Sequence, residues 1–187
     1  MYQFCVSGAA KGASVQEGRE LAQSIGRELA KAHQSLLTGA TIGLPNYAAE
    51  AYKAAGGTMS LGVSPAGSKI EHVMKYRLPT HAYDAILYTG MHYIGRDTLL
   101  VLSADAVISV GGRLGTLHEF TIAMESDTPI GFLQGAGGVS VEIMDILKAA
   151  GESSSKNVFF DTDAGKLVAR LRDELNRRYA KYKDIYK

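Results

Sequence analysis

Short apolar runs alternate with longer amphipathic stretches along this chain, and this alternation is what most limits its fold. The apolar runs predict strands over residues 2–7, 34–38, 58–63, 85–88, 106–110, 129–133 and 158–160. The stretches between them predict helices over 15–33, 93–103, 114–126, 139–150 and 164–179, and one that begins near Pro45 and closes at Gly56. The segment 67–80 is the least clear, with a short helix or irregular structure around 70–76. We therefore predict an α/β fold: a Rossmann-like, doubly wound parallel sheet with helices on both faces, in one domain over 1–187.

The composition excludes several classes of protein. With 46% hydrophobic and 21% charged residues, the 187-residue chain can bury a core, and its formal net charge of +1 gives no basic field for nucleic acid. Its single cysteine, Cys5, excludes a disulfide framework and a multi-cysteine metal site. No apolar run approaches the length of a membrane span, and the start MYQFCVSG is not a secretory signal. We expect a cytoplasmic protein that binds no nucleic acid and no membrane, and we interpret its basic end, which includes Lys183, as a solvated helix terminus.

Glycine is in excess, and it gathers where the apolar runs end. The chain has 21 glycines against four prolines. Three predicted strands end in small-residue turns, which place Ser7 with Gly8, Thr38 with Gly39, and Gly111 with Gly112. Each turn alone is most simply a tight connection, but three that converge at one edge of a parallel sheet favour a phosphate cradle. The usual dinucleotide and ATPase glycine motifs are absent from the sequence.

The most informative string is VGGRLGTLHE, from residue 110 to 119. Gly112, Gly115 and Thr116 can turn backbone N–H groups and a hydroxyl toward a phosphate at the start of the next helix. Glu119 follows one turn later, and we expect it to be ionised beside the helix N-terminus. It could act as a base or stabilise a sugar cation beside that phosphate, or it could simply cap the first turn. The spacing leaves both interpretations open.

This string resembles the LOG-type phosphoribohydrolases and, more broadly, the SLOG superfamily of Rossmann-like nucleotide-binding proteins, often labelled "lysine decarboxylase-like". Their pattern is Pro-Gly-Gly-x-Gly-Thr-x-x-Glu, in which Gly111 here takes the place of the proline and Arg113 that of the second glycine. The family also has a catalytic arginine within Met-x-x-Arg-Lys, and Arg96 is the matching residue, with Asp97 in place of the lysine. With these departures, the chain resembles a divergent branch of the superfamily that is also similar to molybdenum-cofactor carrier proteins. A pyridoxal-phosphate decarboxylase is not expected, because no suitable lysine is placed for it.

The resemblance implies a site, a reaction and an assembly. It implies Arg96 and Glu119 as catalytic residues that cleave the N-glycosidic bond of a nucleoside 5′-monophosphate, giving a free base and ribose 5-phosphate. The alternative is a carrier or sensor that binds a phosphorylated cofactor, molybdopterin-like or nucleotide-derived, without turnover. No cofactor and no metal are expected. The resemblance further implies a homodimer or larger homo-oligomer, for which the helix with Leu44, Ala48 and Tyr52 offers an apolar face.

Two arginines, Arg113 and Arg96, leave alternatives open. Arg113, a long cation inside the glycine turn, could clamp a phosphate or could fill the space that the family leaves for the nucleotide. Arg96 could instead form an ordinary ion pair with Asp97. His118 stands beside Glu119 on the same predicted helix, so we expect it to point to another face and to have a structural role.

Overall fold

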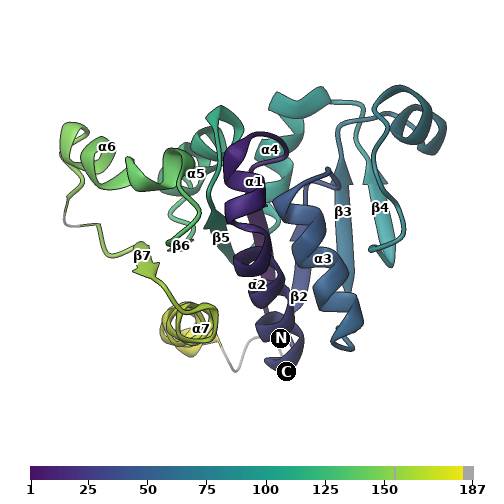
Figure 1. Ribbon diagram of the computed structural model, residues 1–187. Helices are drawn as coiled ribbons and strands as arrows, with labels where there is room; N and C mark the ends of the chain where they lie inside the picture. Colours follow the sequence, from purple (N-terminus) through teal and green to yellow (C-terminus); the bar gives the residue numbers. More distant parts are fainter. Residues whose placement is uncertain (154, 183–187) are drawn as a thin grey trace.

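The chain folds around one seven-stranded sheet whose strands all run parallel. The computed structural model describes residues 1–153 and 155–182 (Figure 1). The strands follow the order β4-β3-β2-β1-β5-β6-β7 across the sheet, which confirms the predicted α/β, Rossmann-like architecture. Their bounds are β1 Gln3–Gly8, β2 Ser35–Thr38, β3 Ser60–Ser64, β4 Ala85–Tyr88, β5 Ala106–Val110, β6 Ile130–Leu133 and β7 Val158–Asp161.

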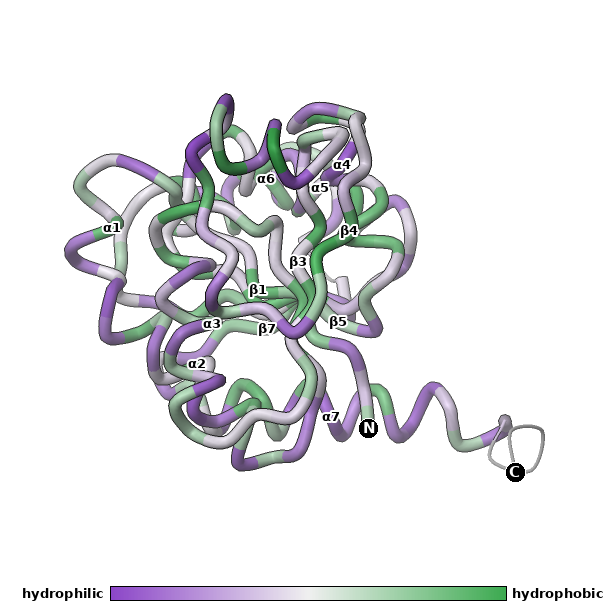
Figure 2. The backbone as a smooth tube through the Cα atoms, turned by 90° about the vertical axis from the view of Figure 1, so that its right-hand side faces the viewer, coloured by the Kyte–Doolittle hydropathy of each residue, from purple (hydrophilic) through white to green (hydrophobic). Residues whose placement is uncertain are grey.

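Helices cover both faces of this sheet. They are α1 Ala13–Glu17, α2 Arg19–Lys31, α3 Leu44–Ala54, α4 His92–Leu102, α5 Leu114–Glu125, α6 Ile143–Ala149 and α7 Ala164–Tyr179. Buried side chains of α2, α3 and α7 form one core against the sheet, and those of α4, α5 and α6 form the other. Both cores share the strands, because successive side chains of a strand point to opposite faces. Figure 2 shows hydrophobic strand segments in the middle of the molecule and hydrophilic stretches outside.

Three predicted segments differ in detail. The helix predicted over 15–33 is divided at Gly18, which both ends α1 and begins α2 and packs tightly against Ala136. The helix predicted over 139–150 starts instead as a 3₁₀ turn, Gly138–Val141, because the N–H of Val139 is bonded to the carbonyl of Gly112. The unclear segment 67–80 contains one turn of π-helix, Glu71–Lys75.

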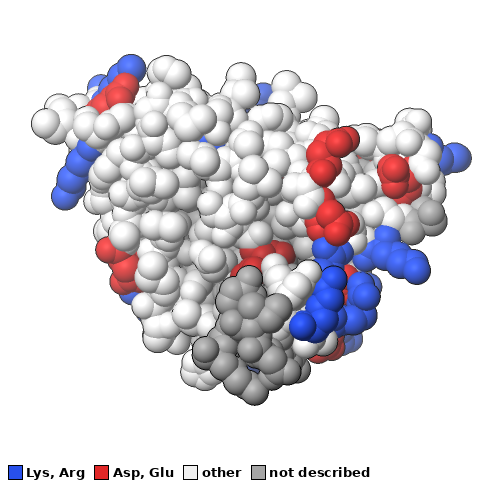
Figure 3. Space-filling model, turned by 180° about the vertical axis from the view of Figure 1, so that it is seen from behind, with Lys and Arg blue, Asp and Glu red and all other residues white. Residues whose placement is uncertain are grey.

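The apolar face that we expected to cover a partner is already covered within the chain. Leu44, Ala48 and Tyr52 are completely buried, because α3 packs against α2 and the sheet. The expectation that they form an intersubunit surface is therefore wrong. Exposed apolar side chains lie instead around α4 and the start of α5: Met91, Ile94, Leu99, Leu102 and Leu114. Figure 3, which views this side of the molecule, shows a broad area with few charged residues, bordered by acidic and basic side chains toward the right.

The cations near the end of α7 are mostly paired. Arg177 and Arg178 both contact Glu174, and Arg178 also reaches Asp127. These contacts agree with a solvated helix end, whereas Lys183 lies outside the described residues. No helix in the described part of the chain combines the length and the apolar character that crossing a membrane requires.

The contact between α2 and α3 leaves no room for a side chain at Gly26. A Cβ atom there would lie 2.1 Å from the carbonyl oxygen of Ala48. Gly26→Ala should therefore force the helices apart and lower the free energy of unfolding by about 1–3 kcal/mol, measured by urea denaturation.

Gly115→Ala is the matched control, because a Cβ at this helical glycine meets nothing within 4 Å. It should leave the stability unchanged or raise it slightly, since alanine favours a helix over glycine. Equal urea midpoints for Gly26→Ala and wild type would contradict a tight contact between the two helices.

Candidate functional site

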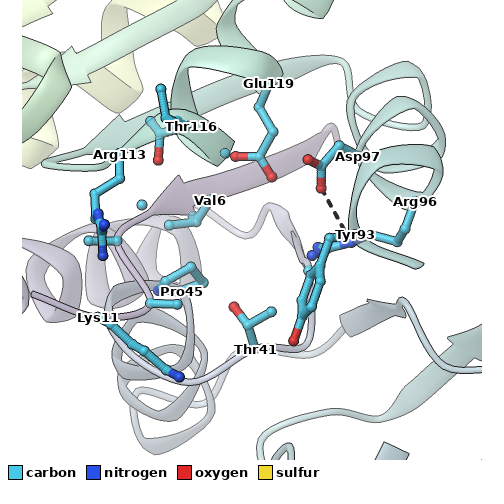
Figure 4. A pocket seen from close by; sticks show the side chains of 16 residues that line it. Val6, Lys11, Thr41, Pro45, Tyr93, Arg96, Asp97, Arg113, Thr116 and Glu119 are labelled. Carbon is cyan, nitrogen blue, oxygen red and sulfur yellow. Dashed lines mark ion pairs between the residues drawn. The ribbon is translucent and has the colours of Figure 1, made fainter. Parts of the chain in front are cut away.

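A cavity opens at the carboxyl edge of the sheet, where the strand order reverses between β1 and β5. The helices that follow these two strands pack on opposite faces of the sheet, so the loops at their starts separate. The space between them is a cavity of about 360 Å³ (Figure 4). Its lining comes from the end of β1 and the loop after it, the loop before α3, and the first turns of α4 and α5.

Most of the residues that the sequence singled out meet in this cavity. Those that line it are Gly8, Gly39, Arg96, Arg113, Gly115, Thr116 and Glu119. The remaining four, Ser7, Thr38, Gly111 and Gly112, are not among the lining residues. Ser7 donates a hydrogen bond to Glu119, which lines the cavity. Gly111 packs against Ser14 and Ala136, and Gly112 packs against Thr116. The hydroxyl of Thr38 accepts the N–H of Ala40 and bonds to Tyr83, so it shapes the turn after β2.

Glu119 reaches into the site from α5 and is almost completely buried. The hydroxyl of Ser7 donates a hydrogen bond to its carboxylate, and the helix carries no acidic cap in its first turn. Glu119 therefore faces the cavity and does not cap α5. Burial, together with the nearby carboxylate of Asp97, raises the pKa of Glu119 to about 7. Near neutral pH the carboxyl is thus only partly ionised, contrary to our expectation, because desolvation outweighs the hydrogen bond from Ser7 and the charge of Arg96.

Arg96 approaches Glu119 from α4, and its guanidinium lies directly over Gly39. A Cβ atom at Gly39 would come within 1.5 Å of an Nη atom of Arg96, so a side chain there would displace the guanidinium from this position. The side chain also lies 5.8 Å from the ring of Tyr93 and has its Nε 3.4 Å from an Oδ of Asp97. This ion pair is the one that the sequence suggested, but it is buried and not on the surface.

The Nε of Arg96 is buried and has no hydrogen-bond partner among the described residues. Its ion pair with Asp97 is too long and poorly directed to serve as a hydrogen bond. Buried donors in folded proteins are nearly always satisfied. Because Arg96 also lines the cavity, the other N–H groups of its guanidinium can bind the oxygen atoms of a ligand.

Sequence analysis missed the part that Asp97 and His118 take in this site. Asp97 lines the cavity, and its second Oδ lies 3.1 Å from Nδ1 of His118. Asp97 was considered as a departure from the family lysine and as an ion-pair partner of Arg96, and not as a residue of the site. Its position beside Arg96, at the start of a helix that enters the site, is the signal that could have identified it.

The opposite end of the cavity carries positive charge. Lys11 follows β1, and Arg113 precedes the first turn of α5; Figure 4 shows both on the same side of the cavity. Thr116 and the N-terminal N–H groups of α5 lie beside them. Arg113 lines the cavity and does not fill it. This end can hold an anion.

No group of three or more histidine, cysteine, aspartate or glutamate side chains gathers as metal ligands within residues 1–153 and 155–182. The expected absence of a metal and of a cofactor stays a prediction.

Comparison with known protein families now identifies the chain. The sequence profile described as the SLOG cluster4 family matches residues 1–168. The chain belongs to this family. This match confirms the SLOG resemblance. No curated protein matches the sequence of this SLOG chain closely enough to transfer an activity.

Solved structures share the fold of this SLOG protein. TM1055 superposes with a TM-score of 0.78 at 22% identity, over 93% of this chain and 99% of that one. The molybdenum cofactor carrier protein from Chlamydomonas reinhardtii gives 0.72 at 24% identity, over 92% and 96%. DNA processing protein A from Helicobacter pylori, described as binding single-stranded DNA, gives 0.62 at 14% identity, over 92% and 81%. At these identities the likeness concerns the fold alone, so the expectation that this SLOG protein binds no nucleic acid remains untested.

The pKa of Glu119 predicts a specific dependence of stability on pH. Because it is raised from 4.5 to about 7 on folding, the folded state holds this proton more tightly than the unfolded chain. The free energy of unfolding should therefore fall as the pH rises through this window. Urea denaturation of wild type and Glu119→Gln, from pH 4 to 8, should show a flatter curve for the variant. Parallel curves would contradict the raised pKa.

Proposed function

We propose that this protein is a nucleoside 5′-monophosphate phosphoribohydrolase, which cleaves the N-glycosidic bond to give a free base and ribose 5-phosphate. The observation that carries the proposal is the meeting of Arg96 and Glu119 in one cavity with Gly115 and Thr116. A protein that only holds a phosphorylated ligand needs the anion site. It does not need a carboxyl with a pKa of about 7 and an arginine with a spare donor beside it.

The cavity suggests an orientation for the substrate. The 5′-phosphate would lie at the start of α5, against Thr116, Arg113 and Lys11. The sugar would then lie in the middle, within reach of Arg96 and Glu119. The base would occupy the far end, where Tyr93 and Thr41 form the wall in Figure 4. An aromatic ring at this end suits a planar heterocycle.

The reaction consumes one water molecule. The bond between the base nitrogen and C1′ breaks, and the oxygen of water bonds to C1′. A proton of the water passes to Glu119 in its ionised form and can then reach the departing base. Glu119 also stabilises the positive charge that develops on the sugar in the transition state. With a pKa of about 7, the carboxyl is close to the value that favours both accepting and returning a proton near neutral pH.

The second candidate is a carrier or sensor of a phosphorylated cofactor. Two departures from the family pattern favour it, namely Arg113 in place of a glycine and Asp97 in place of a lysine. The likeness in fold to a molybdenum cofactor carrier protein also supports this candidate. In this case the basic end of the cavity, with Lys11 and Arg113, would carry most of the affinity.

The variant Glu119→Gln tests turnover. It should abolish release of free base from nucleoside monophosphates while binding of AMP changes little. The amide keeps the shape but loses the charge that acts in the transition state. The expected loss in kcat is on the order of 10² to 10⁴-fold, measured by chromatography of the released base over a panel of purine and pyrimidine monophosphates.

Arg96→Ala should instead weaken both binding and turnover, because a guanidinium also grips oxygen atoms of the bound substrate. Calorimetry with AMP, ribose 5-phosphate and adenosine provides the control for the phosphate. Equal affinity for adenosine and AMP would contradict a phosphate site at Thr116. Tight binding of a phosphorylated ligand by a wild-type protein that releases no base would favour the carrier.

We also expect a homodimer or larger homo-oligomer. The apolar side chains around α4, among them Ile94 and Leu102, lie exposed on a face with few charges, and such a surface favours association (Figure 3). Light scattering at micromolar concentration should give a mass of at least twice 20.0 kDa. Ile94→Lys together with Leu102→Lys should return the protein to monomers, and a wild-type monomer would refute the assembly.

A further inference from the structure

Asp97 is a buried carboxylate between two cavities. One Oδ faces Arg96, at 3.4 Å from Nε, and the residue lines the main cavity. The other Oδ faces His118, at 3.1 Å from Nδ1. The side chain of Asp97 is 8% exposed, whereas that of His118 is 37% exposed and lines a separate hollow on the outer side of α5. His118 thus reaches from the outside of the molecule to the wall of the site.

The contact assigns the proton on His118. A carboxylate only accepts hydrogen bonds, so Nδ1 of His118 must carry the hydrogen that points to Asp97. Nε2 then remains available on the outer side. The ring of His118 leaves α5 on a different side from Glu119, as expected, and its contact with Asp97 connects it to the wall of the site.

Asp97 needs this donor because its surroundings oppose its charge. Burial raises the pKa of Asp97, while Arg96 and the hydrogen bond from His118 lower it. The other titratable groups around it are Glu119 on α5 and Cys5 on β1, and both lie within its electrostatic reach. If Asp97 took up a proton, Arg96 would lose its only ion-pair partner among the described residues.

We propose that His118 is a positioning residue of this site, which acts through Asp97 to hold the Arg96 guanidinium beside the cavity. The proposal rests on the proposed function only where it concerns substrate, because the contacts from His118 through Asp97 to Arg96 exist without any ligand. His118 makes no contact with the cavity itself, since the lining residue is Asp97. Its effect on a ligand would thus pass entirely through the buried carboxylate.

The first test titrates Asp97 in the ligand-free protein by carbon NMR of its carboxyl group. His118→Leu should raise the titration midpoint of Asp97 by about one pH unit, because the hydrogen bond to its charged form is lost. His118→Asn should restore the wild-type midpoint, because the asparagine amide can donate in place of Nδ1–H. His81→Leu is the matched control. Nε2 of His81 lies 2.9 Å from Oε1 of Glu50, and neither residue lines the cavity. Equal midpoints in His118→Leu and wild type would overturn the proposal.

The second test measures binding of AMP between pH 5 and 8. His118→Leu should weaken AMP below neutral pH by up to about tenfold, the factor that one pKa unit represents, and His118→Asn should not. A loss that is equal at all pH values and is not rescued by asparagine would indicate a merely structural role and would overturn the proposal. A wild-type protein that binds no AMP would instead contradict the proposed function, while the ligand-free titration still decides the role of His118.

If His118→Leu does not fold, nitrogen NMR of the wild-type protein can show which ring nitrogen of His118 carries the proton. The neutral ring should carry its proton on Nδ1, and a proton on Nε2 would overturn the proposal.

Discussion

The position of β1 between β2 and β5 is the constraint on which the rest of the structure depends. The chain leaves these central strands toward opposite faces of the sheet, so no helix can close the gap at their carboxyl ends. Residues from both faces then line one space, with Arg96 from α4 and Glu119 from α5 on one side and Pro45 from α3 on the other. The contact between Ser7 on β1 and Glu119 fixes the carboxyl at the point where the two halves of the sheet meet.

The second constraint is the balance of buried charge. Two carboxyl groups, Asp97 and Glu119, share a wall with one buried cation, Arg96. Burial raises the pKa of both carboxyl groups, and the charge of Asp97 raises that of Glu119 further. Lys11 and Arg113 are exposed at the other end, where their charge is well solvated. The site is therefore divided into an end that attracts anions and an end where a proton is easily gained or lost.

Sequence reasoning was most successful where a single period or motif decides the outcome. The alternation of strands and helices was sufficient for the parallel sheet, and the family resemblance implied one site for Arg96 and Glu119, which line the same cavity. Sequence reasoning failed where the role of a residue depends on a contact between segments that are distant in the sequence. Nothing in the local pattern shows that Thr38 bonds to Tyr83 or that α2 covers Tyr52. The same holds for His118, whose meaning depends on a carboxylate 21 positions earlier in the chain.

The tight fit of Arg96 over Gly39 links two distant parts of the chain. The guanidinium occupies the volume in which any side chain at Gly39 would have to start. A side chain at Gly39 would therefore displace the guanidinium from its present place beside the cavity, whereas a shorter residue at position 96 would free that space. Replacing both residues should thus cost less than the sum of the single changes, which couples the turn after β2 to α4 although they are far apart in the sequence.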